Sequence, residues 1–252
     1  MNTAVDVNLK ENLKSLKLPH MAGELDSALR QARDAGQDYA DFLLQLTEHE
    51  IRIRSENRLK RRLKEARFPL LKTMEDFDFS AAPDLDRRLI RHICTNEYVK
   101  ERKNVIFMGK SGTGKTHLAT ALGVEACRQG IRTRFASACG LANELIEARH
   151  EKDLQRALKR YASYGLLILD ELGYIPFSKE GAELLFQVLA ERHEKGSVII
   201  TTNLGFADWT EVFGDANLTA ALLDRLTHRA HIIECTWESY RLQETMKNRQ
   251  KA

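Results

Sequence analysis

The spacing of apolar residues changes character once along the chain. Residues 9–33 carry apolar side chains three or four positions apart, which predicts helix with a break at Pro19. A second helical pattern runs from about residue 38 through a basic stretch to about residue 66 and ends before Pro69. These patterns predict a small all-helical N-terminal domain over residues 1–70.

After a connector at 71–83, the pattern first predicts a helix over 84–101 and then alternates between short apolar strands and helices. Helices are expected at 115–129, 140–163 and 181–195, with Gly130 and Gly196 placed where helices often end. Strands are expected at 104–108, 131–136, 165–169, 197–201 and 230–235. This alternation is typical of an α/β domain in which helices flank a parallel sheet, here over residues 71–252.

A glycine-rich motif follows the first expected strand. Residues 109–116 match the pattern G-x-x-x-x-G-K-[ST] between a strand and a helix. The glycines allow backbone N–H groups to surround phosphate oxygens at a helix N-terminus, which favours anions. Lys115 would neutralise the β- and γ-phosphates of ATP, and Thr116 would offer its hydroxyl to Mg²⁺. The expected ATP-binding residues are Gly109, Lys110, Ser111, Gly112, Thr113, Gly114, Lys115 and Thr116.

Two acids close the strand at 165–169. Asp170 and Glu171 follow four apolar residues, at the strand end where open α/β sheets bind ligands. We expect Asp170 to hold the Mg²⁺ shell and Glu171 to polarise the attacking water. Asn203 follows a third strand, where it either contacts the γ-phosphate or the water, or forms a turn. Phe77 and Phe79 in the connector either pack on adenine or belong to the core.

The net charge of the chain is +3, and the positive charge is local. Residues 51–72 contain nine Lys or Arg and two Glu, a net charge of +7 that leaves −4 for the other 230 residues. This distribution fits a surface that contacts phosphate groups, although basic helices are often only solvated. The candidate DNA contacts lie close to one face of the helix: Arg54, Arg58, Arg61 and Arg62.

The four cysteines are scattered without a C-x-x-C pair, which favours free thiols in a reducing compartment over disulfides or a zinc site. The first residues lack an apolar signal core, and no apolar run approaches 18 residues. We therefore expect a cytoplasmic protein that does not span a membrane.

Several motifs occur together in one order. Besides the two nucleotide motifs, the chain has Asp-Glu-Leu-Gly-Tyr at 170–174, Ile-Thr-Thr-Asn at 200–203, Leu-Leu-Asp-Arg-Leu at 222–226 and Ser-Tyr-Arg at 239–241. This set resembles the IstB family of transposition helper ATPases, which are related to DnaC-type helicase loaders within the AAA+ class. The resemblance covers about residues 1–245, and the stretch 173–182 is especially similar although we derive no physical role for it.

The resemblance implies an oligomeric, Mg²⁺-dependent ATPase that assembles on duplex DNA as a head-to-tail ring or helical filament and assists a transposase. It implies that Asn203 is the sensor-1 residue, Arg225 an arginine finger that reaches a neighbour's ATP, and Arg241 the sensor-2 arginine. From periodicity alone, an ordinary surface charge is the better interpretation of either arginine. Since only 11 residues follow Arg241, we expect no sizeable C-terminal lid.

Three other functions share parts of this pattern. A helicase loader has the same chemistry and a different client. A small-molecule P-loop kinase leaves Arg225, Arg241 and the basic helix without a role. A nucleotide-gated DNA-binding scaffold without turnover is disfavoured by the intact pair of Asp170 and Glu171.

Overall fold

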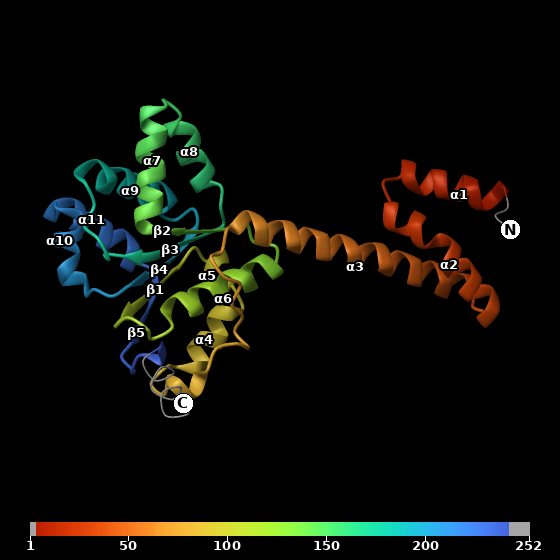
Figure 1. Cartoon of the computed structure of the whole chain (residues 1–252), viewed down its shortest axis with the longest axis horizontal. Helices are drawn as coiled ribbons and strands as arrows, with labels where there is room; N and C mark the ends of the chain where they lie inside the picture. The colour runs from red at the N-terminus through yellow and green to blue at the C-terminus, as the bar shows by residue number, and fades with distance from the viewer. Residues whose placement is uncertain (1–3, 242–252) are drawn as a thin grey trace, which may run out of the picture. The chain divides into compact units, whose positions relative to one another are not determined.

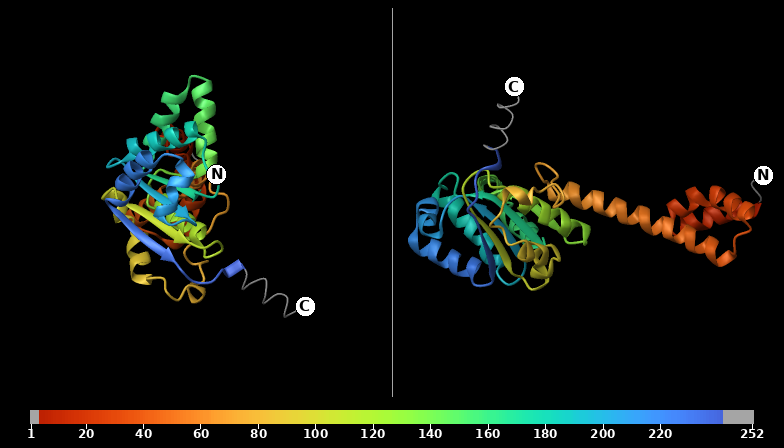
Figure 2. Two further views of the ribbon diagram at one scale, coloured as in Figure 1. Left: turned by 90° about the vertical axis from the view of Figure 1, so that its left-hand side faces the viewer. Right: turned by 90° about the horizontal axis from the view of Figure 1, so that it is seen from below.

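The computed structural model describes residues 4–241 of the chain. Contacts divide the chain into two compact units, Met1–Arg61 and Arg62–Ala252, and the long helix α3 (Tyr39–Ala66) passes through the boundary (Figures 1 and 2). No helix within residues 4–241 is long and apolar enough to cross a membrane. The expectation that no lid follows Arg241 concerns residues 242–252, which lie outside the described residues.

The first unit consists of α1 (Ala4–Ser15), α2 (Pro19–Ala35) and the first part of α3. The predicted break at Pro19 is confirmed, because this residue opens α2 where its missing N–H costs nothing. The apolar stripe of α2 packs against α3 through Met21, Leu25, Ala28 and Leu46. Glu50 of α3 also accepts a hydrogen bond from the N–H of Met21 at 2.7 Å, and so caps the first turn of α2.

The second unit contains a five-stranded parallel sheet, as the sequence predicts. The strand order is β2-β3-β4-β1-β5, and every neighbouring pair is parallel. The strands are β1 (Asn104–Gly109), β2 (Thr133–Ser137), β3 (Leu166–Leu172), β4 (Ser197–Thr202) and β5 (Ala230–Cys235). In this order β4 separates the strand before the glycine-rich loop from the strand that ends in the two acids.

Helices cover both faces of this sheet because successive strand residues point to opposite faces. Leu166 and Ile168 belong to the core with the helices α4 (Arg87–Cys94), α5 (Glu97–Lys100) and α6 (Lys115–Arg128). Leu167 and Leu169 belong to the opposite core. Figure 1 shows the two groups on either side of the strands. The second group comprises α7 (Ala138–His150), α8 (Leu154–Ala162), α9 (Lys179–Arg192), α10 (Trp209–Phe213) and α11 (Ala216–Thr227).

Three local predictions are wrong, each because a residue other than glycine takes a left-handed conformation. The helix expected over 84–101 breaks at Asn96 (φ 59°), and the helix expected over 140–163 breaks at Lys152 (φ 59°). Helix α9 ends at Arg192, and Glu194 (φ 58°) rather than Gly196 makes the left-handed turn. Gly130 does end α6 as predicted, with φ 91° and its N–H bonded to the carbonyl of Cys127.

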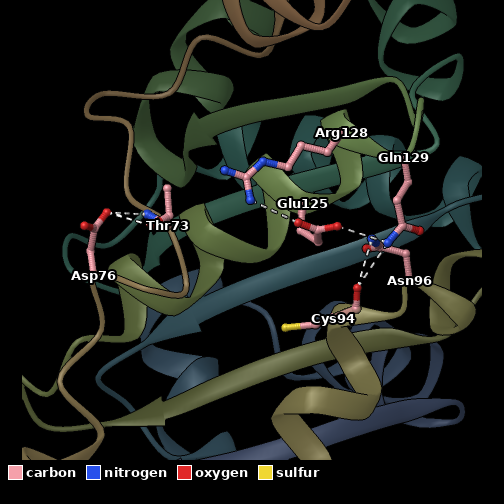
Figure 3. Close-up of polar contacts among 7 residues, drawn as sticks. All are labelled: Thr73, Asp76, Cys94, Asn96, Glu125, Arg128 and Gln129. Carbon is pink, nitrogen blue, oxygen red and sulfur yellow. Dashed lines mark hydrogen bonds and ion pairs between the residues drawn. The ribbon is translucent and has the colours of Figure 1, made fainter. Parts of the chain in front are cut away.

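Two short 3₁₀ turns complete the second unit, η1 (Phe79–Ala81) in the connector and η2 (Phe206–Asp208) before α10. The connector folds on itself, since Asp76 accepts hydrogen bonds from the N–H (3.0 Å) and hydroxyl (2.8 Å) of Thr73. Figure 3 shows this turn on one side of Arg128 and, on the other side, Gln129, which donates to the carbonyl of Cys94, the last residue of α4. The ring of His117, in the first turn of α6, lies 2.9 Å from the carbonyl oxygen of Thr73. The connector is therefore ordered against α6 and places its side chains beside the helix N-terminus.

Candidate nucleotide site

The glycine-rich loop joins β1 to α6, and Gly114 is the N-cap residue of that helix. Lys115, the first helical residue, turns its side chain back into the loop. Its Nζ donates to the carbonyl oxygens of Gly109 at 2.6 Å and Lys110 at 2.7 Å. Burial lowers the pKa of this ammonium group. The loop thus surrounds a cation with backbone dipoles, the arrangement to which the β- and γ-phosphates of a nucleotide bind.

Next to the lysine, a chain of hydrogen bonds joins α6, β3 and β4. The hydroxyl of Thr116 donates to Asp170 Oδ1 at 2.8 Å, and the hydroxyl of Thr201 donates to the same oxygen at 2.5 Å. Thr201 Oγ1 in turn accepts the N–H of Glu171 at 2.9 Å. Asp170 is buried and Glu171 is exposed. The two adjacent acids therefore differ in setting, one fixed beside Thr116 and the other open to the pocket.

Glu171 owes its orientation to an irregularity in the sheet. The pairing of β3 with β4 shifts between Leu169 and Leu172, and Glu171 has φ 57°. A left-handed conformation costs a residue other than glycine on the order of 1 kcal/mol, and such strain concentrates at functional sites. The bulge interrupts the regular alternation of side chains along β3, and Glu171 lines the cavity together with the nucleotide loop.

A cavity of about 460 Å³ lies over the loop. Of the residues predicted from the sequence, Glu171, Asn203 and Arg241 line this cavity together with Ser111, Gly112, Thr113, Gly114, Lys115 and Thr116. Asp170 does not line the cavity itself but accepts a hydrogen bond from Thr116, which does. Gly109 and Lys110 accept hydrogen bonds from Lys115 through their carbonyl oxygens. The structure therefore brings Arg241 to the pocket of its own chain.

The wall nearest the connector is partly apolar. Phe77 lines the cavity and makes edge contacts with Phe79, at 5.0 Å between ring centroids, and with His117, at 5.3 Å. His117 Nε2 lies 2.9 Å from the carbonyl oxygen of Thr73. Both phenylalanines pack against the core beside α6, and Phe77 is the one of the two that also lines the cavity.

Arg225 lies elsewhere. Arg225 is not among the described residues that line the nucleotide cavity. Its guanidinium carbon lies 5.0 Å from the centre of the Phe186 ring on α9, and its Nη1 donates to the carbonyl of Ala221 at 3.3 Å. It borders a separate small hollow together with Arg102, Arg192 and Arg229.

The four candidate DNA contacts have different surroundings. Arg54, in the first unit, donates to Glu50 at 2.6 Å and to the carbonyl of Lys17. Arg58 and Arg61 are exposed. Arg62, in the second unit, is half-buried with its guanidinium near Gly130. Arg54 is thus part of the structure of the helical unit, which the spacing of basic residues did not indicate.

Two contributors to the site were missed in the sequence. Thr201 lies within the strand expected at 197–201, but a buried threonine in a strand gives no sign that its hydroxyl joins both acids. Trp237 lies after β5, and its indole N–H donates to the carbonyl of Thr113 at 2.9 Å. The sequence has only two tryptophans, and this one lies in a polar stretch. A lone large aromatic residue in such a stretch was the signal that could have pointed to it.

Similarity to known proteins agrees with this geometry. The model of the IstB-like ATP-binding protein family matches residues 11–248. An insertion sequence IS21 ATP-binding protein of Pseudomonas aeruginosa is 42% identical over 235 residues, which cover 93% of this chain and 89% of that protein.

Among solved structures, AMPPCP-bound DnaA from Aquifex aeolicus has a TM-score of 0.57 at 22% identity, over 72% of this chain and 56% of that one. The DnaC helicase loader has a TM-score of 0.51 at 25% identity, over 58% of this chain and 86% of that one. The chain spans little more than half the length of DnaA, and this likeness concerns the AAA+ fold. With the P-loop, the acids and the family match in agreement, the chain belongs to the IstB-like ATP-binding protein family.

Proposed function

We propose that this protein is an ATP-hydrolysing AAA+ protein that assembles on duplex DNA and assists the transposase of an insertion sequence. The observation that carries the hydrolytic part is the single cavity shared by Lys115, Glu171, Asn203 and Arg241, with Thr116 bonded to Asp170 beside it. Membership of a family of insertion-sequence ATP-binding proteins supports the transposition part.

Each residue has a distinct task in hydrolysis. Lys115 and the N–H groups of the loop bind the β- and γ-phosphates. Glu171 accepts a proton from the water that attacks the γ-phosphorus, the bond to the β,γ-bridging oxygen breaks, and ADP and phosphate leave. Asn203 is placed to orient that water or a γ-phosphate oxygen. Arg241 adds positive charge at the pocket wall.

The donor set next to the loop fits Mg²⁺. Thr116 and Asp170 present a hydroxyl and a carboxylate oxygen in direct contact, at 2.8 Å. Magnesium prefers oxygen ligands and is commonly held by one or two protein groups together with phosphates and water. When bound, the metal neutralises charge on the β- and γ-phosphates. These two residues would hold it.

A second copy of the chain supplies the cation that stabilises the remaining negative charge on the γ-phosphate. Arg225 lies apart from the nucleotide cavity of its own chain, at the surface formed by α9 and α11. A head-to-tail contact that carries this arginine into the next copy's cavity yields a ring, or a helical filament when the rotation does not close. Of the four candidate arginines, we assign DNA contact to Arg58 and Arg61, which are exposed.

A helicase loader is the second candidate, and the likeness to the DnaC structure favours it. One experiment separates the two. The protein is added with ATP to its cognate transposase and duplex DNA, and in parallel to a replicative helicase and single-stranded DNA. Stimulated strand transfer together with DNA-stimulated ATP hydrolysis supports the proposal. Helicase loading without any effect on strand transfer would establish the alternative.

A further inference from the structure

The residues after β5 hold the outer side of the nucleotide loop. We call residues 237–241 the strap. The indole N–H of Trp237 donates to the carbonyl of Thr113 at 2.9 Å, and the backbone N–H of Tyr240 donates to the carbonyl of Gly112 at 3.0 Å. Two successive carbonyls of the loop therefore have their hydrogen-bond donors in one short segment more than 120 residues further along the chain.

The contact between the strap and the loop is close enough to restrict the sequence of the loop. Gly112 has φ 82°, and a side-chain carbon on this residue would collide with the hydroxyl group of Ser239. Only glycine meets both the left-handed conformation and this close approach. The other end of the strap is anchored, because Trp237 is 6% exposed and belongs to the core cluster on the α6 side of the sheet.

These contacts matter because of the way a P-loop binds phosphate. Its N–H groups must point inward to the phosphates, which turns neighbouring carbonyls outward. A buried carbonyl without a donor costs free energy, so a loop lacking outer donors would relax into other conformations. Trp237 and Tyr240 supply these donors, and both also line the nucleotide cavity. The strap is thus attached to the loop on one side and faces the nucleotide on the other.

We propose that Trp237 is a positioning residue for the triphosphate, which acts by donating its indole N–H to Thr113 and so holding the loop in its phosphate-binding conformation. The proposal rests on the nucleotide site of the proposed function. Trp237 does not take part in bond breaking. Its loss therefore raises the dissociation constant for ATP and leaves the chemical step largely intact.

The second tryptophan provides a matched control. Trp209 is fully buried in the opposite core cluster, and its indole nitrogen has no hydrogen-bond partner among the described residues. Trp209→Phe and Trp237→Phe each remove the same atoms from a core. Only Trp237→Phe removes a hydrogen bond to the nucleotide loop.

The test compares the full-length wild type with both variants. We expect Trp237→Phe to raise the dissociation constant for ATP and the KM about tenfold, the effect of losing one buried hydrogen bond, with kcat changed less than about threefold. Trp209→Phe should leave both constants within about twofold of wild type, although both variants lose resistance to urea. If Trp237→Phe also binds ATP within about twofold of wild type, the positioning role is wrong. If the wild type itself fails to hydrolyse ATP, the proposed function fails instead.

A second pair of variants covers the case in which Trp237→Phe does not fold. Tyr240→Pro and Tyr240→Ala both remove the exposed ring, but only proline removes the N–H that donates to Gly112. We expect Tyr240→Pro to bind ATP several-fold more weakly than Tyr240→Ala. Equal affinities would contradict the role of the strap.

Discussion

The guanidinium of Arg225 stacks over the ring of Phe186, with 5.0 Å between its central carbon and the ring centroid. The stack holds the arginine against α9, at a distance from the loop that contains Lys115. The proposed function assigns this side chain to the nucleotide of a second copy of the chain. It is not placed to act on the nucleotide of its own chain.

This relationship predicts complementation between two inactive variants. Lys115→Ala cannot use its own site, and Arg225→Ala retains a normal loop. Each alone should hydrolyse ATP at least about 10³-fold more slowly than wild type in the presence of DNA, because an arginine at the γ-phosphate contributes that much in related systems. Mixtures should regain part of the activity. Wild-type turnover by Arg225→Ala alone would exclude a shared site.

The Lys115→Ala variant should not bind ATP at useful concentrations. Lys115 is the cation that the loop itself surrounds, with its Nζ within 2.7 Å of two loop carbonyls. Equilibrium binding of a fluorescent ATP analogue measures the effect. Lys100→Ala, which removes an exposed lysine at the end of α5, is the control and should bind normally. Near-normal affinity of Lys115→Ala would remove the phosphate-binding role from this loop.

The Glu171→Gln variant should bind ATP and fail to turn it over. The amide keeps the shape of the side chain and the N–H bond to Thr201, whereas the loss of the base slows hydrolysis roughly 10²–10⁴-fold. Single-turnover measurements with saturating ATP separate the two steps. Glu147→Gln, at an exposed position on α7, should behave as wild type. Full activity of Glu171→Gln would assign the base to another group.

The exposed pair Arg58 and Arg61 should contribute to DNA affinity without sequence preference. Replacing both by alanine should weaken binding to every duplex alike. It should also make the dependence of log affinity on log salt shallower by about two units, since each phosphate contact contributes about 0.9. The control removes the same charge from α2 by Arg30→Ala and Arg33→Ala. It should leave both the DNA affinity and its dependence on salt unchanged. Arg54→Ala is unsuitable here, because it also breaks the contact with Glu50. An unchanged salt slope would place the DNA contacts elsewhere.

Acid should loosen the first turn of α2. Burial opposes the ionisation of Glu50, but the N–H of Met21 and the guanidinium of Arg54 outweigh it and lower the pKa below the ordinary 4.5. The folded-state pKa is lower than the unfolded-state pKa, so the stabilisation is complete above pH 4.5 and is lost as the pH falls through the folded-state value. The protection factor of the Met21 amide, which is its intrinsic exchange rate divided by its observed rate, should fall over this window in the wild type. In Glu50→Gln the protection factor should be low already at pH 7 and nearly independent of pH.

The sequence predicts the sheet and the loop because their signals are local. Apolar runs bounded by polar residues define all five strands, and the glycine spacing at 109–116 belongs to one continuous stretch. The break at Lys152 carries no such signal, and Asn96 gives only a weak one, since asparagine adopts the left-handed conformation more often than most residues. The position of Arg225 and the bond from Trp237 to Thr113 depend on how distant segments pack, which periodicity does not encode. Most of the predicted site residues thus line the pocket, whereas the contacts that hold the loop from outside could not be predicted from the sequence.

The place of β1 between β4 and β5 has a consequence for the synthesis of the protein. Thr113 and Trp237 are 124 positions apart, so at about 5–20 residues per second the strap emerges on the order of ten seconds after the loop. Until then the nascent chain contains the whole motif but lacks β5 beside it and the donors on its outer side. If the strap has the role that we propose, ATP binds more weakly to a ribosome-bound or prematurely terminated chain than to one that includes the strap, although both contain the intact motif.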